Sequence, residues 1–245
     1  MIPTNPPELT ADSINDDFQR LFIEIVLNHA KRVIEHLDDP GEIPPLRLML
    51  LGTAGTGKTT AVQTLLQAMK SILDKHGLGT DFYRVGAYTG CAAFNVRYSA
   101  STLHRLFEIL NPFHFAELPD GSTKLHDFQT KMANTHLLIF DEISMIGRQI
   151  MGKIDARCDQ ATSATANPRH HTLGAMSCVG VGDPAQCPPI KDEIYFNKES
   201  HRDSKTDPEA ARVQYSHRGL NVYASFDEVI ILNQVHRVRQ KKQGT

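Results

Sequence analysis

One short segment, GTAGTGKT at residues 52–59, restricts the fold of this chain more than any other. An apolar stretch at 46–51 precedes it, and apolar side chains recur at helical spacing from Val62 to Leu73. A strand, a glycine-rich loop and a helix in this order direct several backbone N–H groups and the positive end of the helix dipole at one point. The segment therefore predicts a phosphate-binding loop between a buried strand and a helix.

The residues of this loop predict how a nucleoside triphosphate is held. Its glycines let the backbone N–H groups surround the phosphates, and Lys58 is placed to reach the β- and γ-phosphates. The hydroxyl of Thr59 is placed to hold Mg²⁺. The predicted nucleotide-binding residues are Gly52, Thr53, Ala54, Gly55, Thr56, Gly57, Lys58, Thr59 and Thr60.

The composition excludes several other classes of protein. No apolar run approaches the length of about 18 residues needed to span a membrane, so we expect no membrane association. The four cysteines are widely spaced, which makes disulfides unexpected and an intracellular, reducing compartment the default. The histidines lack zinc-ligand spacing and no G-x-S-x-G segment occurs, so neither a zinc site nor a serine hydrolase is predicted. The net charge of −2 neither indicates nor excludes a polyanionic partner.

Apolar segments along the chain predict the fold class. They occur at 82–88, 136–140, 178–181 and 229–232, and helical patterns or long connections separate them. Strands separated by helices indicate an α/β fold, with a parallel sheet covered by helices on both faces. A further helix is predicted from Phe18 to Leu37, before the loop. The polar stretch at 191–218 is interpreted as a surface loop or insertion.

An acidic pair follows the apolar segment at 137–140. Asp141 lies at the C-terminal edge of that strand, where it can hold Mg²⁺, and Glu142 is placed to polarise a water for attack on the γ-phosphate. Small-molecule kinases with this kind of loop usually lack such an adjacent base, so the pair favours a hydrolase. An alternative is that Glu142 caps a helix that begins near Ser144.

A third segment, GDPAQCPP at 182–189, follows the apolar strand at 178–181. It brings the amide of Gln186 to the same edge of the sheet, where ligands of open α/β sheets bind. Gln186 is therefore expected close to the γ-phosphate. The alternative is a proline-rich turn with no ligand.

The loop, the acidic pair and the Gln186 segment in this order resemble the superfamily 1B DNA helicases. The resemblance is strongest to the PIF-type enzymes and their transposon-borne relatives and weaker to the RecD type, and it spans roughly residues 14–240. The segments that match family motifs are 15–22, 89–95, 101–107, 141–145, 182–190 and 232–237. The departures include one extra residue before Gln19, Cys187 in place of a leucine, and Val238 in place of a glutamine.

This resemblance implies a RecA-like P-loop NTPase and a 5′-to-3′ DNA helicase that uses ATP and Mg²⁺. Gln19 occupies the position that recognises adenine. The implied catalytic residues are Lys58, Glu142, Gln186 and Arg237, with Thr59 and Asp141 as metal ligands. The implied contacts to DNA phosphates are Thr89, Asn95, Thr102 and His104. Alternatively, Thr102 caps a helix and His104 is a satisfied core histidine.

The resemblance also predicts the domain organisation. We expect a flexible N-terminus at 1–13, a RecA-like ATPase lobe at 14–235, and the start of a second lobe at 236–245. The expected partners are single-stranded DNA, duplex junctions and that second lobe. In a eukaryotic cell the resemblance implies a location in the nucleus or mitochondrion and a role in DNA repair, recombination or telomere maintenance. Two alternatives are a truncated copy with little turnover and a different P-loop enzyme, such as a nucleotide kinase.

Overall fold

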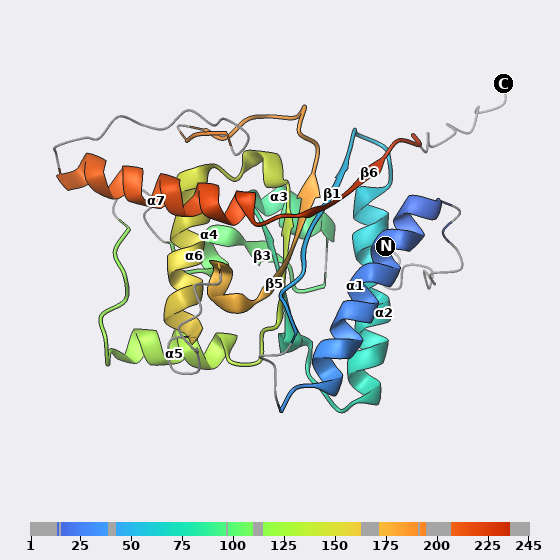
Figure 1. Ribbon diagram of the computed structural model, residues 1–245, viewed down its shortest axis with the longest axis horizontal. Helices are drawn as coiled ribbons and strands as arrows, with labels where there is room; N and C mark the ends of the chain where they lie inside the picture. The colour runs from blue at the N-terminus through green and yellow to red at the C-terminus, as the bar shows by residue number, and fades with distance from the viewer. Residues whose placement is uncertain are drawn as a thin grey trace, which may run out of the picture.

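The computed structural model contains one parallel sheet between two layers of helices (Figure 1). The described residues are 14, 16–38, 43–96, 98–109, 115–162, 172–190, 192–194 and 207–235. The six strands lie in the order β3-β2-β4-β5-β1-β6, and all their pairings are parallel. Their bounds are β1 Arg47–Gly52, β2 Tyr83–Ala87, β3 Ser101–Thr102, β4 Leu137–Asp141, β5 Ser177–Gly182 and β6 Glu228–Leu232.

The helices divide between the two faces of the sheet (Figure 1). On one face lie α1 (Asp17–Glu35) and α2 (Lys58–Lys75). On the other face lie α5 (Thr123–Met132), α6 (Arg148–Thr162) and α7 (Asp207–Ala224). The remaining short helices are α3 Gly90–Val96, α4 Leu103–Leu106 and the 3-10 turns η3 Thr80–Phe82, η4 Ile143–Met145 and η5 Thr172–Ala175. Among the described residues, no helix combines the length and apolarity needed to cross a membrane.

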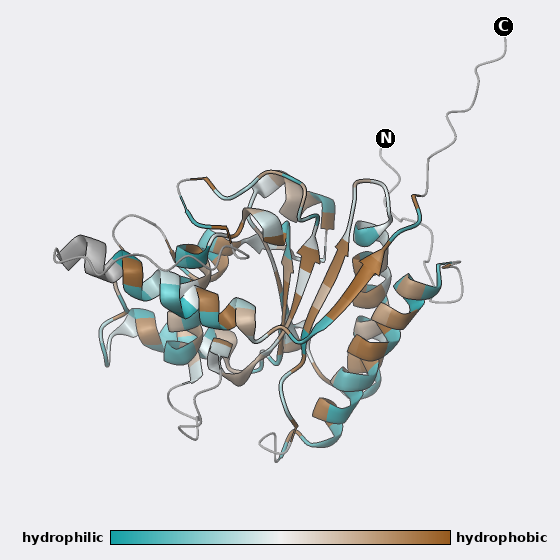
Figure 2. Ribbon diagram, turned by 45° about the horizontal axis from the view of Figure 1, so that its top comes forward, coloured by the Kyte–Doolittle hydropathy of each residue, from teal (hydrophilic) through white to brown (hydrophobic). Residues whose placement is uncertain are grey.

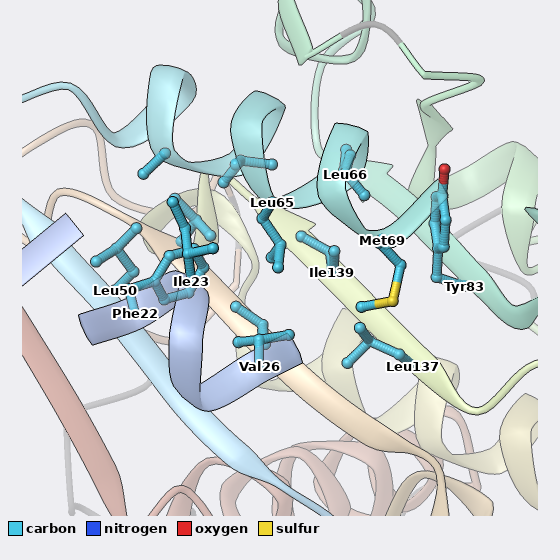
Figure 3. Packing of buried hydrophobic residues seen from close by; sticks show 14 of the residues in the cluster. Phe22, Ile23, Val26, Leu50, Leu65, Leu66, Met69, Tyr83, Leu137 and Ile139 are labelled. Carbon is cyan, nitrogen blue, oxygen red and sulfur yellow. The ribbon is translucent and has the colours of Figure 1, made fainter. Parts of the chain in front are cut away.

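Alternation along the strands explains why both faces are covered. Successive side chains of a strand point to opposite faces, so a strand that is apolar throughout needs a layer on each side. In β4, Ile139 packs against α1 and α2, whereas its neighbours Leu138 and Phe140 pack on the α6 side. Figure 2 shows the strands as mostly apolar and the outer helices as two-sided. In Figure 3, Phe22 and Val26 of α1 lie with apolar residues of α2 and the sheet in the first of these cores.

The predicted α/β class, its parallel sheet and its two helical layers are confirmed. Each predicted strand is present, with ends that differ by one or two residues, and the predicted helix is α1. The interpretation of 191–218 as a surface loop is wrong over 207–218, where α7 begins. Helix α7 packs on α6 through a close backbone contact and an ion pair as well as through buried Val222 and Tyr223, so its polar sequence does not mark it as a loop. A Cβ on Gly219 would lie 1.9 Å from the carbonyl oxygen of Arg148, and Arg218 pairs with Asp155 at 2.8 Å.

Candidate nucleotide-binding site

The glycine-rich loop connects β1 directly to α2, as the sequence predicts. Gly55 and Gly57 both have φ of 84°, a left-handed conformation that other residues adopt only with strain. At Gly52 a Cβ would lie 2.6 Å from Oγ1 of Thr56, so a larger residue would displace the loop. These three positions therefore need glycine for backbone reasons. The result is a tight loop that leads into the N-terminus of α2.

The amino group of Lys58 lies across this loop. Its Nζ donates hydrogen bonds to the carbonyl oxygens of Gly52 at 2.6 Å and of Thr53 at 3.0 Å. Gly57, at the N-cap of α2, has no side chain with which to cap the helix. The loop thus combines the uncapped first-turn N–H groups of α2 with a lysine charge, which is the combination that an anion site requires.

Gln19 joins this loop from a distant part of the chain. Asp16 caps α1 by accepting hydrogen bonds from the backbone N–H groups of Phe18 and Gln19. Gln19 is buried, and its Nε2 donates to the carbonyl oxygen of Thr56 at 3.0 Å. The structure therefore places Gln19 against the loop, while its role in recognising adenine stays a prediction.

Asp141 ends β4 on the same edge of the sheet. Burial raises the pKa of its carboxyl to about 6, and the nearby charge of Lys58 opposes this rise. Strand β4, which Asp141 ends, and strand β1, which leads into the glycine-rich loop, lie on either side of β5 in the sheet. Thr59 is exposed in the first turn of α2. A carboxylate and a hydroxyl are hard oxygen donors of the kind that Mg²⁺ prefers. The residues present therefore fit a magnesium ion, which would restore the ionised form of Asp141.

Glu142 has an unusual backbone. Its φ of 56° and ψ of 45° are left-handed, a conformation that costs a residue other than glycine about 1–2 kcal/mol. Glu142 stands at the N-cap of η4, but its side chain makes no capping hydrogen bond. The alternative reading of Glu142 as a helix cap is therefore not supported, and its carboxylate is not committed to that turn.

Gln186 follows β5, which lies between β4 and β1 in the sheet. Buried Asp183 holds the turn because its Oδ1 accepts from the backbone N–H of Ala185, and its carbonyl oxygen accepts from that of Gln186. The side chain of Gln186 is exposed. Lys58, Asp141 and Gln186 thus come from the C-terminal edges of three adjacent strands.

The sequence analysis did not predict two residues that hold the chain after Gln186 in place. The carboxylate of Asp192 accepts hydrogen bonds from the backbone N–H groups of Gln149 and Ile150, both at 3.1 Å, and so caps α6. Oε2 of Glu193 accepts from Ser216 of α7 at 2.5 Å. The chain that follows Gln186 is thereby fastened to the α6–α7 pair. The available signal was Gly147, which precedes α6 and offers no side-chain cap of its own.

The four candidate DNA contacts lie at or after the C-terminal ends of β2 and β3. Oγ1 of Thr89 accepts a hydrogen bond from a backbone N–H of α3, and Asn95 is exposed on that helix. Thr102 is at the N-cap of α4 without a side-chain capping bond. The half-buried ring of His104 meets the ring of Tyr88 edge-on at 5.7 Å, and burial lowers its pKa. These positions share one side of the sheet, and their contact with DNA stays a prediction.

Three predictions lie outside the described residues. They are the role of Arg237, the flexible N-terminus at 1–13 and the start of a second lobe at 236–245.

Taken together, the parallel sheet, the glycine-rich loop after β1 and the acidic residue at the end of β4 define a RecA-like P-loop NTPase lobe. A family model described as PIF1-like helicase matches residues 30–207. The chain belongs to the PIF1-like helicase family.

Curated relatives and solved structures agree with this assignment. The chain is 28% identical over 145 residues to the ATP-dependent DNA helicase RRM3 of Saccharomyces cerevisiae, covering 58% of this chain and 18% of that protein. It is 30% identical over 153 residues to the ATP-dependent DNA helicase PIF1 of Candida albicans, covering 58% of this chain and 14% of that protein. The chain thus spans less than a fifth of the length of these relatives.

Two solved structures show the same fold. The Pif1 helicase of Candida albicans matches with a TM-score of 0.52 and 22% identity over 91% of this chain and 40% of that one. A Bacteroides Pif1 double mutant matches with a TM-score of 0.52 and 20% identity over 94% of this chain and 44% of that one.

Proposed function

We propose that this chain is the nucleotide-binding lobe of an ATP-dependent DNA helicase that moves 5′-to-3′ on single-stranded DNA. The observation that carries the proposal is the convergence of Lys58, Asp141 and Gln186 at one edge of three adjacent strands. Both curated relatives are ATP-dependent DNA helicases. A structure of two coordinating Pif1 helicases on forked double-stranded DNA, with a TM-score of 0.50, supports duplex junctions as the substrate.

Each residue of the site has a role in this proposal. Lys58 neutralises charge on the β- and γ-phosphates, and Thr59 and Asp141 hold Mg²⁺, which supplies further positive charge there. Glu142, whose carboxylate makes no capping hydrogen bond in η4, accepts the proton of the attacking water. Gln186 contacts the γ-phosphate from the exposed turn after β5, and Gln19 recognises adenine.

We propose that a second RecA-like lobe supplies the opposite wall of the nucleotide site. Closure of two lobes on nucleotide is the kind of motion that couples hydrolysis to movement along DNA. Arg237, at the junction, would then reach the γ-phosphate, a contact worth about 10³–10⁵ in rate in other P-loop triphosphatases. The same proposal includes a role in DNA repair, recombination or telomere maintenance in the nucleus or mitochondrion. Only membership of the family supports this part.

The test compares Glu142→Gln with unchanged protein in a form joined to a second lobe. The substitution keeps the shape of the side chain and removes the base, so ATP turnover should fall by about 10²–10⁴-fold while ATP still binds. Glu24→Gln, at an exposed position on α1, is the matched control and should leave turnover unchanged. Normal hydrolysis by Glu142→Gln would assign the base to another residue.

A second test asks what this lobe can do without a second lobe. Residues 1–245 alone should bind ATP, hydrolyse it very slowly and separate no strands, because in this proposal a second lobe supplies the other half of the ATP site and of the DNA path. ATP-dependent strand displacement by this chain alone would contradict the need for a second lobe.

A further inference from the structure

An open pocket of about 740 Å³ lies at the edge of the sheet, away from the nucleotide loop. It exists because the edge strand β3 is short. In the register of the sheet, β3 pairs only with Gly86 and Ala87, at the end of β2. The earlier part of β2, Tyr83–Val85, therefore has no strand beside it on this side among the described residues, and it forms one wall of the pocket.

The pocket concentrates positive charge. Four cationic side chains line it, each from a different element, against a single carboxylate. They are Lys70 of α2, Arg84 of β2, Arg105 of α4 and Lys131 of α5. The carboxylate, Asp81, already accepts a hydrogen bond from Nδ2 of Asn134 at 2.7 Å. On a chain with a net charge of −2, such a cluster marks a local site for an anion.

Two cations of this basic pocket, Arg84 and Lys131, donate hydrogen bonds to uncharged carbonyl oxygens. Arg84 donates to the carbonyl oxygen of Lys131, and Nζ of Lys131 donates to the carbonyl oxygen of Leu106. Carbonyl oxygens orient these groups without cancelling their charge. Burial lowers the pKa of Lys131, and Arg84 and Arg105 lower it further, against the opposite effect of Glu108.

The two remaining cations are available to a ligand. Lys70 and Arg105 are exposed, and neither forms an ion pair within the described ranges. Tyr98 also lines the pocket. An aromatic ring beside several cations is the combination that proteins use to hold single-stranded nucleic acid.

The position of the pocket identifies its ligand. Ser101 and Arg105 line it, and their direct neighbours in sequence are Thr102 and His104, two of the candidate DNA contacts. Adjacent Cα atoms are only about 3.8 Å apart. We propose that the basic pocket binds the phosphate backbone of a DNA strand whose neighbouring nucleotides lie over Thr102 and His104. This proposal rests on the proposed function, and it adds a second stretch of the DNA path at the outer edge of the sheet.

The test measures binding of a fluorescent single-stranded oligonucleotide of about 16 nucleotides over a range of salt concentrations. The pocket variant carries Lys70→Ala and Arg105→Ala together. The control carries Lys31→Ala and Lys75→Ala, two exposed lysines on α1 and α2 that do not line the pocket. Both variants lose the same charge, so a general electrostatic effect lowers DNA affinity equally in both.

Loss of two phosphate contacts should weaken DNA binding about 2- to 5-fold per contact. It should also reduce the slope of log affinity against log salt by about 0.7 per contact. The control variant should keep the affinity and slope of the unchanged chain to within a few tenths of a log unit, and ATP affinity should be equal in all three proteins.

Three outcomes overturn the proposal in distinguishable ways. Equal DNA affinity in the pocket and control variants removes the pocket from the DNA path and leaves the proposed function standing. No DNA binding by the unchanged chain at low salt contradicts both the pocket and the proposed DNA path. ATP binding that persists in Lys58→Ala protein and disappears when Lys70→Ala and Arg105→Ala are added would make the pocket a site for free nucleotide.

Discussion

Replacement of His29 by glutamine should remove a large part of the acid sensitivity of this fold. His29 lies on α1 with its Nε2 2.7 Å from Oγ of Ser177, at the start of β5. Burial lowers the pKa of this imidazole from 6.5 to about 4, and the charges of Arg32 on the same helix and Arg47 of β1 lower it further. The folded protein therefore holds His29 neutral at a pH where the unfolded chain already takes up a proton.

The sign and size of the effect follow from this difference. Above pH 6.5 the imidazole is neutral in both states and costs nothing. As pH falls from 6.5 to about 4, protonation favours the unfolded chain, and stability is lost progressively. Because one pH unit corresponds to 1.36 kcal/mol, a difference of about 2.5 units amounts to about 3 kcal/mol. That is a substantial part of the 5–15 kcal/mol by which domains are typically stable, roughly a fifth to three fifths.

Urea unfolding at a series of pH values from about 7 to about 4 measures this loss. His29→Gln keeps a hydrogen-bonding group opposite Ser177 and does not titrate, so its free energy of unfolding should fall by about 3 kcal/mol less than that of the unchanged protein. His126→Gln, at an exposed position on α5, is the control and should follow the unchanged protein. Parallel curves for His29→Gln and the unchanged protein would refute the reasoning.

Two further predictions concern the nucleotide site and the packing of α6 and α7. Lys58→Ala should weaken ATP binding by about 2–3 kcal/mol, since it removes a charged phosphate contact, and equal affinities in titrations of the two proteins would exclude this lysine as a ligand. Gly219→Ala should lower the free energy of unfolding by about 1–3 kcal/mol or more, because its Cβ would lie 1.9 Å from a backbone oxygen. Gly90→Ala, where a Cβ meets nothing within 4 Å, should change stability by less than about 1 kcal/mol, and a similar loss in both variants would argue against the close contact.

The nucleotide site could be predicted from sequence because each of its parts is local. The glycine-rich loop, the acidic pair and the Gln186 turn each follow an apolar strand directly. Parallel strands bring their C-terminal ends to one edge, so order along the chain was enough to place them together. The sequence did not predict the contact between Gln19 and the loop, which joins residues 37 positions apart, and the resemblance implied only that Gln19 recognises adenine.

The features that were missed depend on contacts between distant segments. The helix α7 is polar along much of its length, and it contacts α6 through the pairing of Arg218 with Asp155 and the close approach at Gly219 in addition to its few buried apolar residues. No local pattern reports such a pairing. The basic pocket depends on the two-residue length of β3, and strand ends are the part of a fold that sequence patterns determine least.

The cap on α6 has a consequence for how the chain is made. The first turn of this helix leaves backbone N–H groups without intrahelical partners, and Asp192 satisfies two of them from 42 and 43 positions further along the chain. A growing chain leaves the ribosome from its N-terminus at about 5–20 residues per second. Helix α6 therefore emerges several seconds before the residue that completes it, and its start stays uncapped until β5 and the turn of Gln186 have been synthesised.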